Sequence, residues 1–129
     1  MFGIFSRLQG QNNVEIVITG FKSDEGKAVV ALYNTGEQFL ENAYKAKTVD
    51  IKNGQVKVEF ENISDGVYAV SSFHDENEDK EFNMLMGFWP LENYATSNNA
   101  PARFGPPQWE DAKFEVKNKE KVTQKIKMM

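Results

Sequence analysis

Hydrophobic and polar residues alternate along most of this chain, with the period of two that is typical of half-buried β-strands. Val14, Ile16 and Ile18 recur at every second position and the alternation is strict over residues 56–60, whereas residues 27–33 are apolar at nearly every position, as in a central strand. Asn53-Gly54 is the strongest hairpin signal in the sequence. The pattern predicts seven strands, around residues 14–18, 27–33, 49–51, 56–60, 67–73, 114–116 and 122–128.

One segment departs from this period. Between residues 37 and 45, Phe39, Leu40, Ala43 and Tyr44 recur at helical spacing, which predicts a short helix with Phe39 and Tyr44 lining the core. Short strands separated by tight turns predict an all-β protein, a seven-stranded antiparallel β-sandwich. We expect residues 1–12 to form an N-terminal extension and residues 13–129 to form one sandwich domain.

Composition narrows the class of protein. The chain has 129 residues, 40% of them hydrophobic, which is enough to fill the core of one domain. The absence of cysteine excludes disulfides, thiolate metal sites and a cysteine nucleophile. A net charge of -4 without a dense basic patch gives no support for nucleic-acid binding. No apolar run is long enough for a membrane span, and residues 1–8 do not read as a signal peptide, so we expect either a cytoplasmic protein or an export signal outside this sequence.

The connection from residue 74 to residue 111 is predicted as a long ordered loop, and such loops are often functional. Its first part has oxygen-bearing side chains at alternate positions, as in calcium-binding loops. The candidate ligands at positions 1, 3, 5, 7 and 9 of that pattern are Asp75, Asn77, Asp79, Glu81 and Asn83. Lys80 and Met86 stand where the pattern favours glycine and glutamate, so a solvated acidic turn is the alternative to a Ca²⁺ site.

His74 is the only histidine, and it follows a predicted strand. Beside Asp75 it is a candidate general base for a small hydrolase, although no nucleophile stands in a recognisable motif. We favour a structural histidine that donates a hydrogen bond to a loop carbonyl.

The rest of the loop is rich in amides and aromatic rings, the combination found in ligand clefts. A sugar or a peptide stacked on Trp89, Tyr94 or Trp109 is one interpretation, and self-packing of the loop is the other and the default. The candidate ligand-binding residues are His74, Trp89, Tyr94, Ser97, Asn98, Asn99, Arg103 and Trp109.

Several segments together resemble a bacterial domain family of unknown function, number two-one-four-one. These segments are residues 26–33 (GKAVVALY), 66–77 (GVYAVSSFHDEN), 94–99 (YATSNN) and 103–107 (RFGPP). The resemblance implies a transthyretin-like or immunoglobulin-like β-sandwich, usually in exported proteins of Gram-negative bacteria. It therefore implies a periplasmic or extracellular location, and it implies no enzyme activity.

Our leading hypothesis is a non-enzymatic binding or accessory domain of the bacterial cell envelope, whose partner is a protein or a carbohydrate. A small hydrolase using His74 and Asp75 is one alternative. A structural subunit that assembles through an exposed edge strand is another. The sequence leaves the oligomeric state open and indicates no cofactor other than the candidate Ca²⁺.

Overall fold

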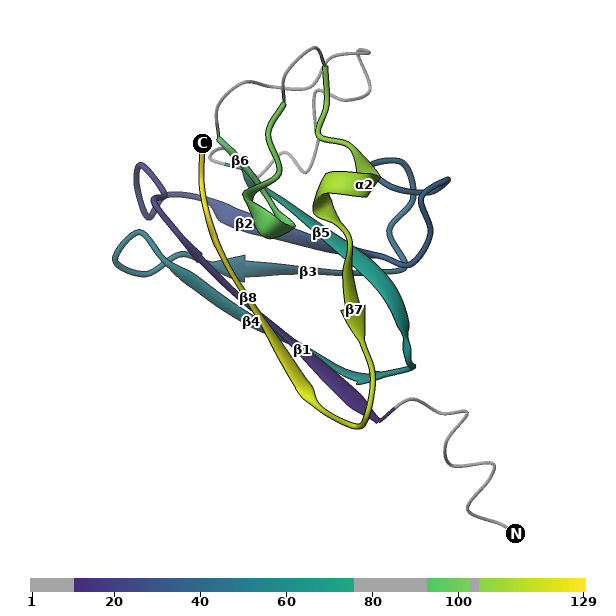
Figure 1. Cartoon of the computed structure of the whole chain (residues 1–129). Helices are drawn as coiled ribbons and strands as arrows, with labels where there is room; N and C mark the ends of the chain where they lie inside the picture. The colour runs from purple at the N-terminus through teal and green to yellow at the C-terminus, as the bar shows by residue number, and fades with distance from the viewer. Residues whose placement is uncertain (1–10, 76–92, 103–104) are drawn as a thin grey trace, which may run out of the picture.

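The computed structural model describes residues 11–75, 93–102 and 105–129, which form two β-sheets packed face to face (Figure 1). One sheet has three strands in the order β4-β1-β8, and the other has the order β3-β2-β5-β6, with β7 also paired to β5. The strands are β1 (Asn12–Thr19), β2 (Lys27–Tyr33), β3 (Lys45–Asp50), β4 (Val56–Ile63), β5 (Gly66–Asp75), β6 (Tyr94–Thr96), β7 (Phe114–Val116) and β8 (Lys121–Lys127).

The predicted all-β sandwich is confirmed, with two differences in detail. The described residues contain eight strands, because β6 forms inside the stretch predicted as loop. One pair is parallel: β8 runs alongside β1 in the same direction, while the other strand pairs are antiparallel. Hydrophobic alternation is the same in both kinds of pair, so the pattern alone does not distinguish them.

The prediction of a short helix near residues 37–45 is wrong. Residues 36–41 form successive turns, and β3 begins at Lys45. Leu40 has a left-handed φ of 66°, which interrupts any helical path, and a helical i to i−4 bond forms only from Asn42 N to Gln38 O, 2.9 Å. Phe39 is buried as expected, but Tyr44 is 43% exposed and does not line the core.

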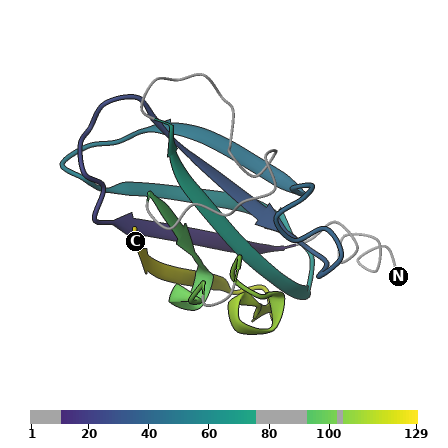
Figure 2. The ribbon, with the colours of Figure 1, turned by 90° about the horizontal axis from the view of Figure 1, so that it is seen from above.

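The described helices are very short. They are the 3-10 helix η2 (Ser97–Asn99) and the helix α2 (Trp109–Ala112), which lie beside each other at one side of the sandwich (Figures 1 and 2). None of the helices found in the described part of the chain has the length and apolar character that crossing a bilayer needs.

Two hydrophobic clusters hold the elements together. The larger cluster fills the space between the sheets, with Ile16 and Ile18 of β1 facing Val30 and Leu32 of β2 across the core. The smaller cluster covers the outer face of the five-stranded sheet and consists of Tyr33, Phe39, Ala69, Ala100 and Ala112. Burying each large aliphatic side chain contributes about 1.5–3 kcal/mol, so the larger cluster dominates stability while the smaller one attaches the turns and α2 to the sheet.

The corner between β4 and β5 is fixed by a tyrosine. Tyr68 Oη donates a hydrogen bond to the carbonyl oxygen of Ser64 at 2.8 Å, a contact across a strand corner that recurs in immunoglobulin-like sandwiches. Gly66 leaves room for the ring, because a Cβ at this position would lie 3.3 Å from the Tyr68 ring, a close contact. The corner thereby sets where β5 starts.

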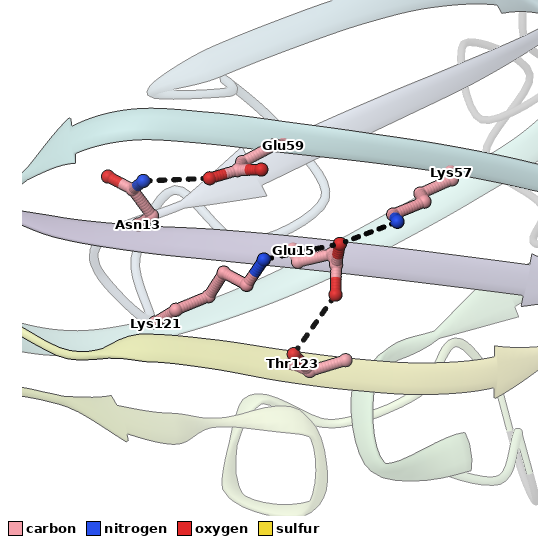
Figure 3. A network of polar contacts seen from close by, with 6 residues as sticks. All are labelled: Asn13, Glu15, Lys57, Glu59, Lys121 and Thr123. Atoms are coloured by element: carbon pink, nitrogen blue, oxygen red, sulfur yellow. Dashed lines mark hydrogen bonds and ion pairs between the residues drawn. The ribbon is translucent and has the colours of Figure 1, made fainter.

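The outer face of the three-stranded sheet is polar and centres on Glu15 (Figure 3). The Glu15 carboxylate lies 3.2 Å from Lys57 Nζ on β4 and 3.7 Å from Lys121 Nζ on β8, and it accepts a hydrogen bond from Thr123 Oγ1 at 3.2 Å. The hydrogen bond with Lys57 is the largest cause that lowers the pKa of Glu15; burial opposes the shift, and Thr123 and Lys121 add to it. One carboxylate therefore ties all three strands together.

The lowered pKa predicts a defined pH dependence of stability. Because the folded-state pKa of Glu15 lies below its ordinary value of 4.5, the ionised carboxylate stabilises the fold fully above that value. This contribution is lost as the pH falls through the folded-state pKa. We expect Glu15→Gln to unfold at lower urea concentration than the wild type at pH 7, with the difference becoming smaller as the pH falls below 4.5. Glu61→Gln, an exposed change on β4, controls for the loss of one negative charge. A Glu15→Gln difference that stays constant from pH 7 to pH 3 would show that the ion pairs are not its origin.

Candidate binding groove beside Trp109

His74 has the structural role expected for it. Its Nε2 lies 2.7 Å from the carbonyl oxygen of Glu25, and because a carbonyl only accepts, Nε2 carries the proton. The imidazole also packs edge-on against Phe21, with ring centroids 5.4 Å apart. The histidine thus fastens the loop between β1 and β2 to the end of β5.

The structure does not bring His74 and Asp75 together as a catalytic pair. They are consecutive residues of β5, so their side chains point to opposite faces of the sheet, His74 toward the core and Asp75 outward. Ser72 shares the inner face with His74, but both side chains are buried in the core, and Ser72 Oγ and His74 Nδ1 have no hydrogen-bond partner there. A substrate has no access to this face among the described residues, so the hydrolase geometry is missing.

The Ser97 side chain forms hydrogen bonds with the backbone of neighbouring elements. Along one edge of β5, residues 66–68 pair with β7 and residues 71–73 pair with β6, which leaves Val70 between the two partner strands. Ser97 Oγ accepts the Val70 N–H at 2.9 Å and donates to the carbonyl oxygen of Ala112 at 2.6 Å. The fully buried serine therefore replaces the missing strand partner and joins β5 to α2.

Asn98 and Asn99 are used in the same way. Asn98 exchanges two hydrogen bonds with the Gln124 side chain, of 2.8 and 3.0 Å, and its Nδ2 donates to the carbonyl oxygens of Asp111 and Lys113. Asn99 Oδ1 accepts the Lys127 N–H at 3.0 Å. Both residues have positive φ, which asparagine tolerates well. These side chains link η2 to β8 and α2, so they hold this part of the loop in place.

The remaining predicted site residues divide into two groups. Tyr94 is buried in β6 on the outer face, opposite Phe73 of β5. Residues that lie outside the described part of the chain are Asn77, Asp79, Glu81, Asn83, Trp89 and Arg103. Within residues 11–75, 93–102 and 105–129, no three histidine, aspartate or glutamate side chains gather as a metal site would require. Because four of the five candidate Ca²⁺ ligands lie outside those ranges, the calcium site stays a prediction.

Trp109 is a predicted site residue that lines an open cavity in the described structure. A groove of about 360 Å³ runs between residues 36 and 39–41 on one side and residues 106–109 on the other. A Cβ on Gly36 would lie 3.1 Å from Cγ and Cδ1 of Trp109, so the indole ring packs directly against the glycine backbone. The indole also contacts Phe39 at 5.9 Å between centroids, and Phe39 contacts Tyr33 edge-on at 5.3 Å.

This row of rings fixes Trp109 on the sheet. Tyr33 Oη lies 2.9 Å from Ser71 Oγ, a buried hydrogen bond that ties the innermost ring to β5. Burial raises the pKa of Tyr33, so its hydroxyl remains protonated well above neutral pH. Trp109 itself stays half-buried. The groove therefore has a rigid aromatic wall that is still accessible from solvent.

Two polar side chains of the groove are not engaged elsewhere among the described residues. Gln108 is the N-cap of α2, yet its side chain makes no capping hydrogen bond. Glu41 lines the opposite side and is exposed, with no hydrogen bond or ion pair from its carboxylate to another described residue. An aromatic wall with a free amide and a free carboxylate is the arrangement by which small-molecule sites orient a ligand.

A family model covers most of the chain. The family described as "uncharacterized protein conserved in bacteria" (DUF2141) matches residues 16–124. The chain belongs to this family. No curated protein and no solved structure matches the chain. The match confirms the resemblance inferred from the motifs, and it extends over the whole DUF2141 sandwich from β1 into β8, including both sides of the groove.

The other groove residues of this DUF2141 protein are not predictable from local sequence patterns. Leu40, Glu41 and Gly36 stand far from Trp109 in the sequence, and only the smaller hydrophobic cluster brings them beside it. Pro106 and Pro107 restrict the backbone next to Gln108, because each proline ring fixes its own φ.

The bridging role of Ser97 predicts a large loss of stability in Ser97→Ala. The change leaves the buried Val70 N–H and Ala112 carbonyl without a partner, at about 1–3 kcal/mol each, so we expect a total loss of about 2–6 kcal/mol by urea denaturation. Ser71→Ala, which removes the one hydrogen bond to Tyr33, is the matched control and is expected to cost about 1 kcal/mol. Equal losses in the two variants would contradict the bridging role.

Proposed function

We propose that this protein is a non-enzymatic binding domain of the bacterial cell envelope, and that the groove beside Trp109 is its contact surface. The observation that carries the proposal is the half-buried Trp109, held rigidly between Gly36 and Phe39 while Gln108 and Glu41 beside it stay free. An aromatic ring that is already immobilised loses little further freedom when it binds a ligand, so the contact yields more net affinity.

The polar groups elsewhere in the segment predicted as a loop, residues 74–111, support a binding role over catalysis. Ser97, Asn98 and Asn99 make hydrogen bonds within the protein, and the Nε2–H of His74 donates to the carbonyl oxygen of Glu25. A hydrolytic site needs a nucleophile and a base within reach of each other and of the substrate. Such a pair is not found among the described residues, whereas a ligand groove needs only the wall and the few polar groups at Trp109.

The envelope location is proposed from the motif resemblance, because relatives with these motifs are usually exported. The absence of cysteine is compatible with either side of the inner membrane. Binding of the purified protein to envelope material tests the binding function and the groove.

We expect the purified protein to co-sediment with at least one envelope preparation from a Gram-negative bacterium, namely peptidoglycan sacculi or outer-membrane vesicles. Gln108→Ala is expected to weaken this association about three- to tenfold, because the exposed amide contributes contacts to the ligand but none to the fold. Gly36→Ala is expected to weaken it further, because the new methyl group displaces Trp109.

Gln55→Ala, an amide change in the tight turn between β3 and β4 and away from the groove, is the matched control and should sediment as the wild type does. Thermal melts of all variants separate loss of binding from loss of folding. Wild-type protein that stays in the supernatant with both preparations would refute the proposed function. Retention that is equally strong in Gln108→Ala and Gly36→Ala would refute the groove as the contact surface.

A further inference from the structure

We infer that the groove beside Trp109 takes a neutral saccharide chain. This inference rests on the proposed function, because it names the class of ligand for the same surface. It is argued from the charge of the groove, the hydrogen-bonding capacity of its free side chains, and the elements that form its walls.

The charge of the groove disfavours an anionic ligand. Glu41 is the one charged residue among those that line it, and no lysine, arginine or histidine does so within the described ranges. The whole chain is also acidic, with a net charge of -4. A phosphate, sulfate or carboxylate in the groove would face Glu41 without a compensating cation, so a ligand without negative charge fits best.

The free side chains require a ligand that both donates and accepts hydrogen bonds. The Gln108 amide has a carbonyl oxygen that accepts and an NH₂ group that donates, while the Glu41 carboxylate only accepts. Sugar hydroxyl groups donate and accept, so neighbouring hydroxyls on one ring satisfy both side chains. A purely apolar ligand would leave both side chains without partners as they lose water, which costs free energy.

The aromatic wall provides the apolar half of the recognition. A pyranose ring presents C–H groups on its faces and hydroxyls at its rim, and this distribution matches an indole wall with polar groups beside it. Pro106 and Pro107 continue the wall with side chains that have almost no conformational freedom to lose. A volume of about 360 Å³ is at the small end of ligand sites, which suits a few sugar units of a chain that extends beyond the groove.

The walls of the groove argue against an extended peptide as the ligand. Peptides bound in extended form add a strand to an exposed sheet edge and gain affinity from backbone hydrogen bonds. The groove lies between the turns of residues 36–41 and the segment of residues 106–109, and neither of these is a strand. A peptide there would depend on side chains alone, and the one charge available, Glu41, would select a basic peptide.

Calorimetry with defined probes tests this inference. The protein is titrated with the neutral oligosaccharides chitohexaose and cellohexaose, with an oligogalacturonate of similar length as the anionic saccharide, and with pentalysine as the basic peptide. We expect binding of a neutral oligosaccharide that weakens about three- to tenfold in Gln108→Ala and is unchanged in Gln55→Ala. We expect Glu41→Gln to retain the neutral saccharide, since an amide also accepts hydrogen bonds, and to bind the oligogalacturonate better than the wild type does.

The outcomes separate this inference from the proposed function. Sedimentation with sacculi that depends on Gln108 but is not competed by either neutral oligosaccharide would overturn the saccharide inference and leave the binding function standing. Binding of pentalysine alone, lost in Glu41→Gln, would overturn it in favour of a basic peptide. A neutral oligosaccharide that binds at the groove, while neither envelope preparation retains the protein, would support the saccharide site and refute the envelope function.

Discussion

A buried strand edge needs a hydrogen-bond partner for each backbone group, and among the described residues β5 has no strand partner on one edge between its pairings with β7 and β6. Ser97 meets this requirement by accepting the Val70 N–H and donating to the Ala112 carbonyl. A side chain without a hydroxyl would leave both backbone groups unsatisfied in the interior, where the cost of each is highest. The position of η2 and the position of α2 both follow from this one bridge.

The groove is a consequence of the same bridge. The Ser97 hydrogen bond holds Ala112, the last residue of α2, against the sheet, and Asn98 fixes the chain on either side of it through Asp111 and Lys113. Trp109, the first residue of α2, therefore points from a fixed helix toward the turns at Gly36 and Phe39. The tryptophan is rigid because two sets of contacts connect it to the sheet. One runs through α2, and the other runs through the row of aromatic rings that ends at Tyr33.

The parts of the fold that sequence reasoning predicted are those encoded locally. Alternation in β1 and β4 and the Asn53-Gly54 turn needed no knowledge of distant residues. The strand β6 was missed because three residues of YAT carry no periodicity, and their extended form depends on pairing with β5. The prediction of a helix over residues 37–45 was wrong for two reasons. Helical spacing of apolar residues also occurs in a turn that places Phe39 against the sheet. In addition, no sequence pattern indicates the left-handed conformation of Leu40.

The candidate site was predicted only in part, for a related reason. The aromatic and amide residues of the loop were identified by residue type, but residue type does not reveal whether a side chain already has hydrogen-bond partners within the protein. Ser97, Asn98 and Asn99 prove to be internal partners, while Gln108 attracted no attention because glutamine at an N-cap has no distinctive pattern. The distinction between a structural amide and a free one depends on long-range contacts, such as that of Asn98 with Gln124 on β8.

The edges of the sheets also bear on how this protein interacts with others. Lys47 Nζ donates to the carbonyl oxygen of Glu59 at 2.7 Å and so covers part of the β4 edge. Asn99 accepts a hydrogen bond from the end of β8. The backbone of Met129 hydrogen-bonds with the backbone of Asn93 and Tyr94 beside β6. Lysines on an edge strand and side chains that occupy its backbone groups both oppose pairing with another chain. Within the described ranges, assembly by strand addition is therefore blocked at several points. The groove beside Trp109, with its free amide and carboxylate, is a surface where an interaction does not have to displace contacts the fold already makes.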